Sequence, residues 1–183
     1  MVNDIMKNAP EDNIRKKIRQ ITRKSPSSKR EEIRKALWPE ILENDLWLRK
    51  KDVGFTTVPR TITLIARIMD QLSGKGKPVS TTYLALWCWV FDEGFVEIKD
   101  PTMLAFESGF SGNRAHHTWK SRMKILEELG FIKSKPGFSN DYQYIIILNP
   151  IQVIKTIYED KSHDHAYNAF ISRAIQVGEL NVT

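Results

Sequence analysis

The order of apolar, polar and turn-forming residues in the middle of the chain predicts two consecutive helices. Asp100 is a good N-cap residue and is followed by proline, so we expect one helix to begin there. The Gly-Phe-Ser sequence at 109–111 should end it in a short turn. An apolar stripe at helical spacing then predicts a longer helix over 112–129, with Ser111 as its cap and Gly130 as its C-terminal glycine.

Short apolar segments before and after these helices predict a small sheet. A strand that starts at Phe131 and a return strand at 142–148 are separated by turn-forming residues, which predicts a β-hairpin. Residues 95–98 should form a further strand that pairs with it. The return strand is apolar on both faces, so we expect other elements to cover both sides. Phe138, in the turn, is expected to pack against its own hairpin rather than to insert into the minor groove of DNA.

Helix, short turn, helix and hairpin, in that order, resemble a winged helix-turn-helix unit. Residues 123–132 are also similar to the junction between recognition helix and wing in winged-helix DNA-binding proteins. The resemblance implies a double-stranded DNA-binding protein that places helix 112–129 in the major groove. Bacterial transcription regulators and plasmid or mobile-element replication proteins both use such units, so a regulatory or a replication-associated role is expected.

The other periodic segments are helical, which predicts a mainly α fold with a small β-hairpin wing and with helical extensions at both ends. Helices are expected over 28–43, 60–73 and 81–92, and in two segments after residue 150. The helix at 81–92 is apolar all round, so Cys88 should be buried. The expected domains are a basic arm (1–27), a helical extension (28–77), the winged helix-turn-helix (78–150) and C-terminal helices (151–183).

One face of helix 112–129 carries polar side chains. Asn113, His117 and Lys120 are separated by four and three positions, and Lys124 follows four later, so all share a face. Such a stripe is often only a solvated helix surface, but the neighbouring turn and hairpin favour contact with base edges or phosphates. The expected DNA-binding residues of helix and hairpin are Asn113, Arg114, His117, Lys120, Ser121, Lys124, Lys133 and Lys135.

The positive charge is concentrated near the N-terminus. The formal net charge is +6, a balance that suits a polyanionic partner. Residues 1–35 contain eleven Lys/Arg against five Asp/Glu, whereas residues 78–150 contain seven against eight. The basic segment could follow DNA phosphates, or it could dock as an amphipathic helix with a solvated basic face. The arm residues expected to contact DNA are Arg15, Lys16, Lys17 and Arg19.

The sequence offers little chemistry for catalysis or metal binding. Cys88 is the single cysteine, which excludes an internal disulfide and a cysteine-based zinc site. His163 and His165 point to different sides of a helix, so Asp164 between them is better explained as a helix cap than as part of a metal site. Motifs of nucleophilic hydrolases are missing. We therefore expect a protein that is not an enzyme and needs no cofactor or metal.

Membrane insertion is not expected either. The longest apolar run is nine residues, Tyr83 to Phe91, whereas a spanning helix needs about 20. The N-terminus lacks the apolar core of a signal peptide. With a single cysteine, these features predict a cytoplasmic protein.

Partners other than DNA remain open. Winged helices also serve as docking domains, and the net charge of −1 over residues 78–150 fits a protein-interaction module or a subunit of a larger nucleoprotein complex. A C-terminal stripe should either pack on its own domain or form the seam of a homodimer. The stripe consists of Ala166, Phe170, Ala174 and Val177.

Overall fold

The computed structural model describes residues 26–91 and 93–181 of the chain. The chain divides into two compact units, residues 1–54 and 55–183. The described elements are mainly helical, with seven α-helices and one small three-stranded antiparallel sheet, as the sequence predicted. Residues 1–25 of the basic arm lie outside the described residues, and with them Arg15, Lys16, Lys17 and Arg19.

The described part of the first unit contains one helix and an irregular segment. α2 (Pro26–Leu37) ends before residue 43, where the predicted helix was expected to stop. Pro39 explains the early end, because proline disfavours helical backbone at the residue before it. A single 3₁₀ turn, η2 (Glu43–Asp45), follows.

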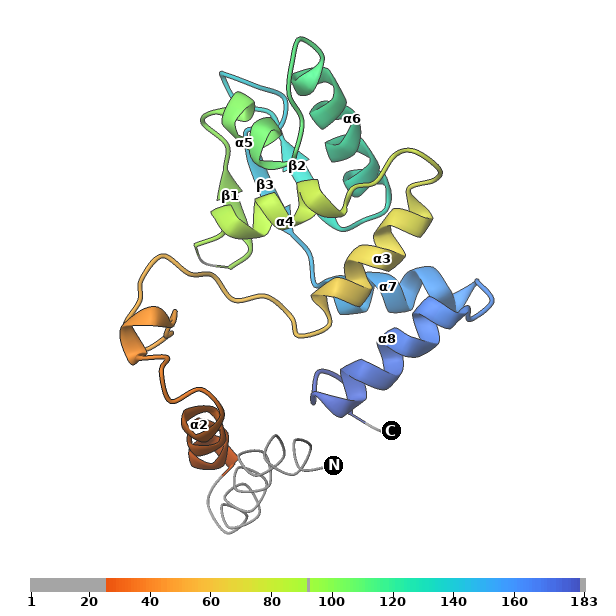
Figure 1. Cartoon of the computed structure of the whole chain (residues 1–183). Coiled ribbons are helices and arrows are strands. Elements are labelled where there is room, and N and C mark those ends of the chain that lie inside the picture. The colour runs from red at the N-terminus through yellow and green to blue at the C-terminus, as the bar shows by residue number, and fades with distance from the viewer. Residues whose placement is uncertain (1–25, 92, 182–183) are drawn as a thin grey trace, which may run out of the picture. The chain divides into compact units, whose positions relative to one another are not determined.

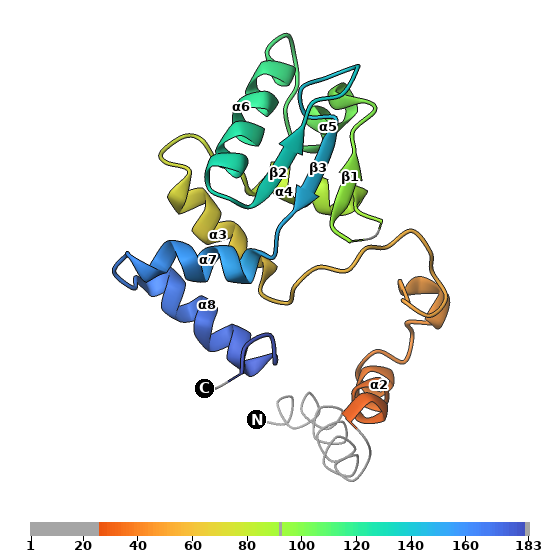
Figure 2. The same ribbon diagram turned by 180° about the vertical axis from the view of Figure 1, so that it is seen from behind.

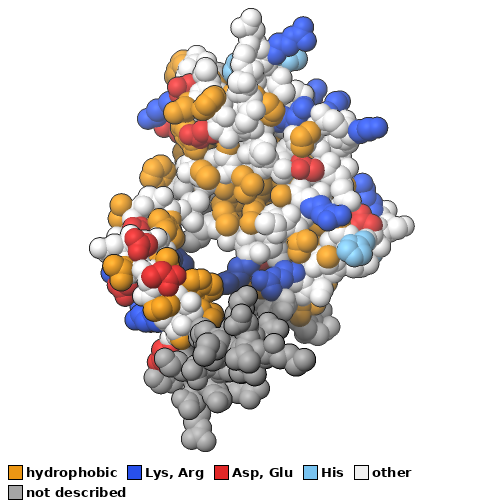
Figure 3. Space-filling view, viewed as in Figure 1, with side chains coloured by type: hydrophobic (Ala, Val, Ile, Leu, Met, Phe, Trp, Pro, Cys, Tyr) orange, Lys and Arg blue, Asp and Glu red, His pale blue; other side chains and the backbone are white. Residues whose placement is uncertain are grey.

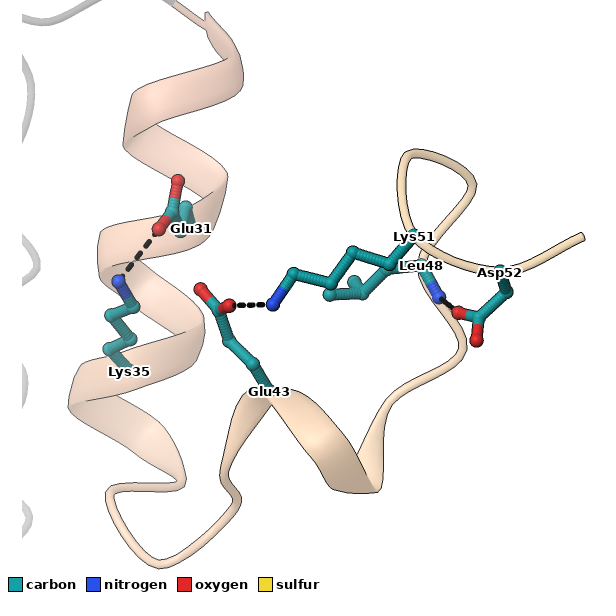
Figure 4. Close-up of polar contacts among 6 residues, drawn as sticks. All are labelled: Glu31, Lys35, Glu43, Leu48, Lys51 and Asp52. Atoms are coloured by element: carbon teal, nitrogen blue, oxygen red, sulfur yellow. Dashed lines mark hydrogen bonds and ion pairs between the residues drawn. The ribbon is translucent and has the colours of Figure 1, made fainter.

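Polar contacts at the surface link side chains of this segment. Within residues 28–54 no side chain is buried, and Trp38 is 53% exposed. Figure 4 shows the contacts of Lys35 with Glu31 (2.7 Å), of Lys51 with Glu43, and of the Leu48 backbone N–H with the Asp52 carboxylate.

The second unit contains the sheet and six of the helices. Its elements are α3 (Ile62–Leu72), α4 (Ser80–Trp89), β1 (Phe95–Glu97), α5 (Pro101–Glu107), α6 (Ala115–Glu128), β2 (Ile132–Lys135), β3 (Tyr144–Ile147), α7 (Pro150–Glu159) and α8 (His165–Gln176). In Figure 1, α4 and α5 lie in front of the sheet, and in Figure 2 the sheet lies in front of them. These helices therefore cover one face of the sheet, and α3, α7 and α8 pack together at one end of the unit.

The sheet has β3 in its centre, antiparallel to both β1 and β2. The predicted pairing of residues 95–98 with the hairpin is confirmed: Val96 lies opposite Ile145. Both side chains are buried against the helices. The expectation that the return strand is covered on both sides is wrong for the described residues, because Ile146 on the other face is 39% exposed.

Helix α4 is buried on most of its circumference but not on all of it. Tyr83 and Leu86 are fully buried, where α3, α5 and α6 pack against the helix. Thr81, Leu84 and Cys88 recur at spacings of three and four and are exposed. The prediction that Cys88 is buried is therefore wrong, because an all-apolar composition does not show which side of a helix its neighbours leave uncovered.

The carboxylate of Asp70 in α3 holds the start of α4. It accepts hydrogen bonds from the backbone N–H groups of Val79 (2.7 Å) and Ser80 (2.9 Å) and from the Ser80 hydroxyl (2.6 Å). Unpaired N–H groups at a helix start are normally satisfied by a local side chain. Here they are satisfied by a different helix, which ties α3 to α4.

The C-terminal helices complete the core of the second unit. Ala166, Phe170 and Ala174 of α8 are buried, and α8 packs against α3. Of the two alternatives for this stripe, packing on its own domain therefore describes Ala166, Phe170 and Ala174, whereas Val177 is only partly buried. Asp164 caps α8, as predicted, by accepting a hydrogen bond from the Tyr167 backbone N–H (2.8 Å). That hydrogen bond lowers the pKa of the Asp164 carboxyl from its usual value.

None of the helices in the described residues is both long and apolar enough to cross a membrane.

Candidate nucleic-acid interface

The position of α6 depends on the helix and turn before it. Asp100 caps α5, as predicted, by accepting hydrogen bonds from the backbone N–H groups of Thr102 and Met103. The turn to α6 spans residues 108–114 and is longer than expected. Gly109 and Gly112 both have positive φ angles (88° and 78°), a conformation that glycine adopts without steric cost.

Helix α6 begins at Ala115, three residues later than predicted. The expected cap, Ser111, lies before Gly112, which turns the chain away from helical geometry. Arg114 occupies the N-cap position instead and makes no side-chain cap hydrogen bond. Asn113 and Arg114 are therefore exposed residues of the turn rather than members of the first helical turn.

Trp119 anchors α6 to the rest of the unit. Its side chain is fully buried, and its ring meets the edge of Tyr142 with centroids 5.9 Å apart and planes at 77°. Met123 and Leu126, at helical spacing from it, are also fully buried. This apolar stripe turns the polar stripe of α6 outward, as its spacing predicted.

A groove with a volume of about 590 Å³ lies between α6 and the hairpin. Four of the predicted residues line its α6 side: His117, Lys120, Ser121 and Lys124. The remaining lining residues are Glu127, Ser134, Asp141 and Tyr142. Figure 3 shows several Lys and Arg side chains on the part of the surface where α6 lies.

Ion pairs across and beside the groove give it mixed charge. The Lys120 ammonium lies 2.7 Å from the Asp141 carboxylate, and this hydrogen bond lowers the pKa of Asp141 from its usual value. Lys124 lies 3.7 Å from Glu128, one turn further along α6. Both lysines are at the surface, where such pairs are weak and can exchange partners. A phosphate could therefore replace either carboxylate.

A second hydrogen-bonded contact joins α6 to the hairpin. The Glu127 carboxylate accepts hydrogen bonds from the backbone N–H (3.0 Å) and the hydroxyl (2.6 Å) of Ser134. Because Ser134 faces α6, its neighbours Lys133 and Lys135 lie on the opposite face of the sheet. The structure therefore does not bring these two lysines together with the lysines of α6.

The turn between the strands of the hairpin differs from expectation. Phe138 is fully exposed, so the prediction that it packs against its own hairpin is wrong. Gln143 occupies the inside of the turn instead and accepts hydrogen bonds from the Ser139 backbone N–H (3.1 Å) and hydroxyl (3.0 Å).

Sequence reasoning identified the α6 side of the groove but not its other side. Glu127, on α6 itself, was not predicted, and neither were Ser134, Asp141 and Tyr142, which join the groove only through the packing of the hairpin on α6. Asp141 is a carboxylate in the turn of the predicted hairpin. Nothing in the sequence pairs it with Lys120, which is 21 positions away.

In the parts of the chain that are described, no three or more His, Cys, Asp or Glu side chains are grouped so that they could hold a metal ion. The chemistry of the groove is that of hydrogen bonding and charge.

Comparisons of the chain with protein-family models, with curated proteins and with solved structures found no match.

Proposed function

We propose that residues 78–150 form a winged helix-turn-helix unit that binds double-stranded DNA through α6. The order α4, β1, α5, α6, β2, β3 supports this proposal, since it places a helical pair before a hairpin that follows directly from the second helix. An α-helix fits the major groove of B-form DNA, and winged units present their second helix there.

The observation that carries the proposal is the groove beside α6. Lys120 and Lys124 lie one turn apart on its α6 side, where they would hold phosphates as the helix enters the major groove. His117 precedes them on the same face, nearer the start of the helix. Asn113 and Arg114 are exposed where α6 begins, the end that reaches base edges in such units.

The cellular role follows from the same resemblance. A protein of this kind would act as a transcription regulator or as a replication-associated factor of bacteria or mobile elements. Both roles require one helix to recognise a duplex site while charged residues nearby hold the backbone.

The second candidate function is that of a protein-interaction module. The carboxylates of Asp141 and Glu127 line the same groove as the lysines, and residues 78–150 carry a net charge of −1. A mixed groove of this kind also suits a peptide that carries both charges. The two functions differ in their dependence on salt.

We expect duplex binding to weaken steeply with salt, and part of this dependence to come from α6. Each phosphate contact contributes a slope of about 0.9 to a plot of log affinity against log salt concentration. The double substitution Lys120→Ala and Lys124→Ala should therefore flatten the slope by about 1.8. The measurement is a fluorescence titration of a labelled duplex at several salt concentrations.

The matched control is the double substitution Lys155→Ala and Lys161→Ala, which removes the same charge from exposed positions on and after α7. It should leave the slope nearly unchanged. A wild-type protein that releases duplex DNA at low salt would instead support the interaction module. Equal slopes for both double variants would remove α6 from the interface.

The Lys120–Asp141 contact predicts a substitution that strengthens binding. Asp141→Asn removes a negative charge from the groove and frees the Lys120 ammonium for a phosphate, so duplex affinity at low salt should rise severalfold. Stability should change little, since both side chains are at the surface. Asp160→Asn, an exposed position after α7, is the control and should have little effect. Unchanged or weaker binding by Asp141→Asn would show that Lys120 does not hold a phosphate.

A further inference from the structure

The face of the sheet opposite the helices is not covered by any described helix of the unit, as Figure 2 shows. Directly paired residues in neighbouring strands point to the same side. One row on this side is Phe95, Ile146 and Lys133, and the next is Glu97, Tyr144 and Lys135. We call these six residues the open sheet face.

Aromatic rings occupy one side of the open sheet face. Phe95 is 45% exposed, and its ring stacks on Tyr144 with centroids 6.3 Å apart and planes at 17°. Beside them is a hollow of about 500 Å³ at the β1 edge. Phe91, which lines this hollow, is 94% exposed. Phe91 and Phe95 line one hollow and Phe95 stacks on Tyr144, and grouped exposed apolar side chains mark binding sites more often than single exposed rings do.

Positive charge borders these rings. Lys133 and Lys135 are exposed on β2, at the opposite edge of the sheet from β1, and Lys99 lines the hollow. The single carboxylate on this face, Glu97, lies 3.5 Å from the Lys99 ammonium. The open sheet face itself has two lysines and one glutamate, and Lys99 beside it adds a third lysine, so this surface is basic within a segment whose net charge is −1.

We propose that the open sheet face binds single-stranded nucleic acid. Exposed aromatic rings with lysines around them are the combination that such ligands require, because bases stack on the rings and phosphates pair with the lysines. Paired bases in a duplex are already stacked on each other and are not free for these rings. The excess of lysine favours a polyanion over an apolar or basic protein segment.

This surface is separate from the groove proposed to bind duplex DNA. The groove lies between α6 and the hairpin, on the side that Ser134 faces, whereas Lys133 and Lys135 face the other way. Substitutions on one surface should therefore leave the other ligand unaffected. The two proposals can fail independently.

The test is a fluorescence anisotropy titration of the full chain with a labelled single strand of about 15 thymidines. Stacking on an aromatic side chain contributes enough that Phe95→Ala or Tyr144→Ala should weaken binding about five- to 150-fold. Tyr144→Phe keeps the ring and should bind like the wild type. Ile175→Ala removes an exposed apolar side chain from α8 and serves as the control.

Two further measurements exclude misfolding of the variants and purely electrostatic binding as explanations of the result. Phe91→Ala changes a side chain that is almost fully exposed, so it should fold normally and still weaken single-strand binding severalfold. An abasic strand of the same length keeps the phosphates and removes the bases, and the wild type should bind it much more weakly than the thymidine strand.

Equal affinity for the abasic and thymidine strands would overturn the proposal, and so would unchanged binding by folded Phe91→Ala and Tyr144→Ala proteins. Failure of the wild type to bind single strands at low salt would do the same and would point to a protein partner. Lys120→Ala should weaken duplex binding and spare single strands, so loss of duplex binding alone leaves this proposal standing.

Discussion

Replacing Trp119 with alanine should lower the free energy of unfolding by about 3–5 kcal/mol. The indole extends from α6 and is fully buried. Its ring meets Tyr142, just before β3, edge to face, and the His116 ring stacks on it with centroids 5.7 Å apart. Removing it leaves a cavity that the fully buried neighbours Met123 and Leu126 can fill only in part. Because the same ring holds α6 in place, duplex affinity should fall as well.

Urea unfolding followed by circular dichroism measures this loss, and Trp38→Ala is the matched control. Trp38 is 53% exposed, so its substitution should change the free energy of unfolding by no more than about 0.5 kcal/mol. A loss below about 1 kcal/mol for Trp119→Ala, or an equal loss for both variants, would contradict the packing described for α6.

The parts of the fold that the sequence predicted well depend on local interactions. Asp100 and Asp164 each cap a helix through a hydrogen bond to a backbone N–H two or three residues away. Gly130 has the positive φ angle expected after a helix, 81°. Such features involve only a few consecutive residues, so their residue types are sufficient to place a helix start or end.

Features that depend on long-range packing were predicted less well. The exposure of Cys88 depends on which side of α4 its neighbours leave uncovered. The direction of Lys133 and Lys135 depends on strand register, and a shift of one residue would reverse it. Sequence periodicity shows that a strand has two faces, but it does not show which face meets the helices.

In the candidate site too, the local part could be predicted from the sequence and the part that depends on long-range packing could not. The polar stripe of α6 could be predicted because helical spacing puts His117, Lys120 and Lys124 on one face. Asp141 could not be assigned to this site, since it reaches Lys120 only through the path of the turn between β2 and β3. The open sheet face was missed because the apolar return strand was expected to be covered on both sides.

The second large effect concerns Arg114 and Lys120. Their substitution by alanine should weaken duplex binding in different ways. Arg114 is exposed at the start of α6, where a guanidinium can reach a guanine edge through two hydrogen bonds. Arg114→Ala should therefore cost about 1–3 kcal/mol on the preferred duplex and relax the preference at one or two base positions. Lys120 lies further along the helix, beside Asp141, and is placed for a phosphate.

Lys120→Ala should accordingly weaken binding to every duplex by a similar factor and reduce the salt slope by about 1. It also leaves the Asp141 carboxylate unpaired beside the DNA backbone, which adds repulsion. Neither substitution should move the melting temperature much, because Arg114 makes no cap hydrogen bond and the Lys120 ion pair is at the surface.

The most direct test of duplex recognition by α6 is a competition titration of these two variants and the wild type. The preferred duplex would first be selected from a random pool with the wild-type protein, and a scrambled duplex of equal length would be the competitor. We expect Arg114→Ala to lose the difference between the two duplexes and Lys120→Ala to keep it at lower affinity. If both variants are folded and bind both duplexes like the wild type, α6 does not contact DNA, and the protein-interaction module becomes the better account.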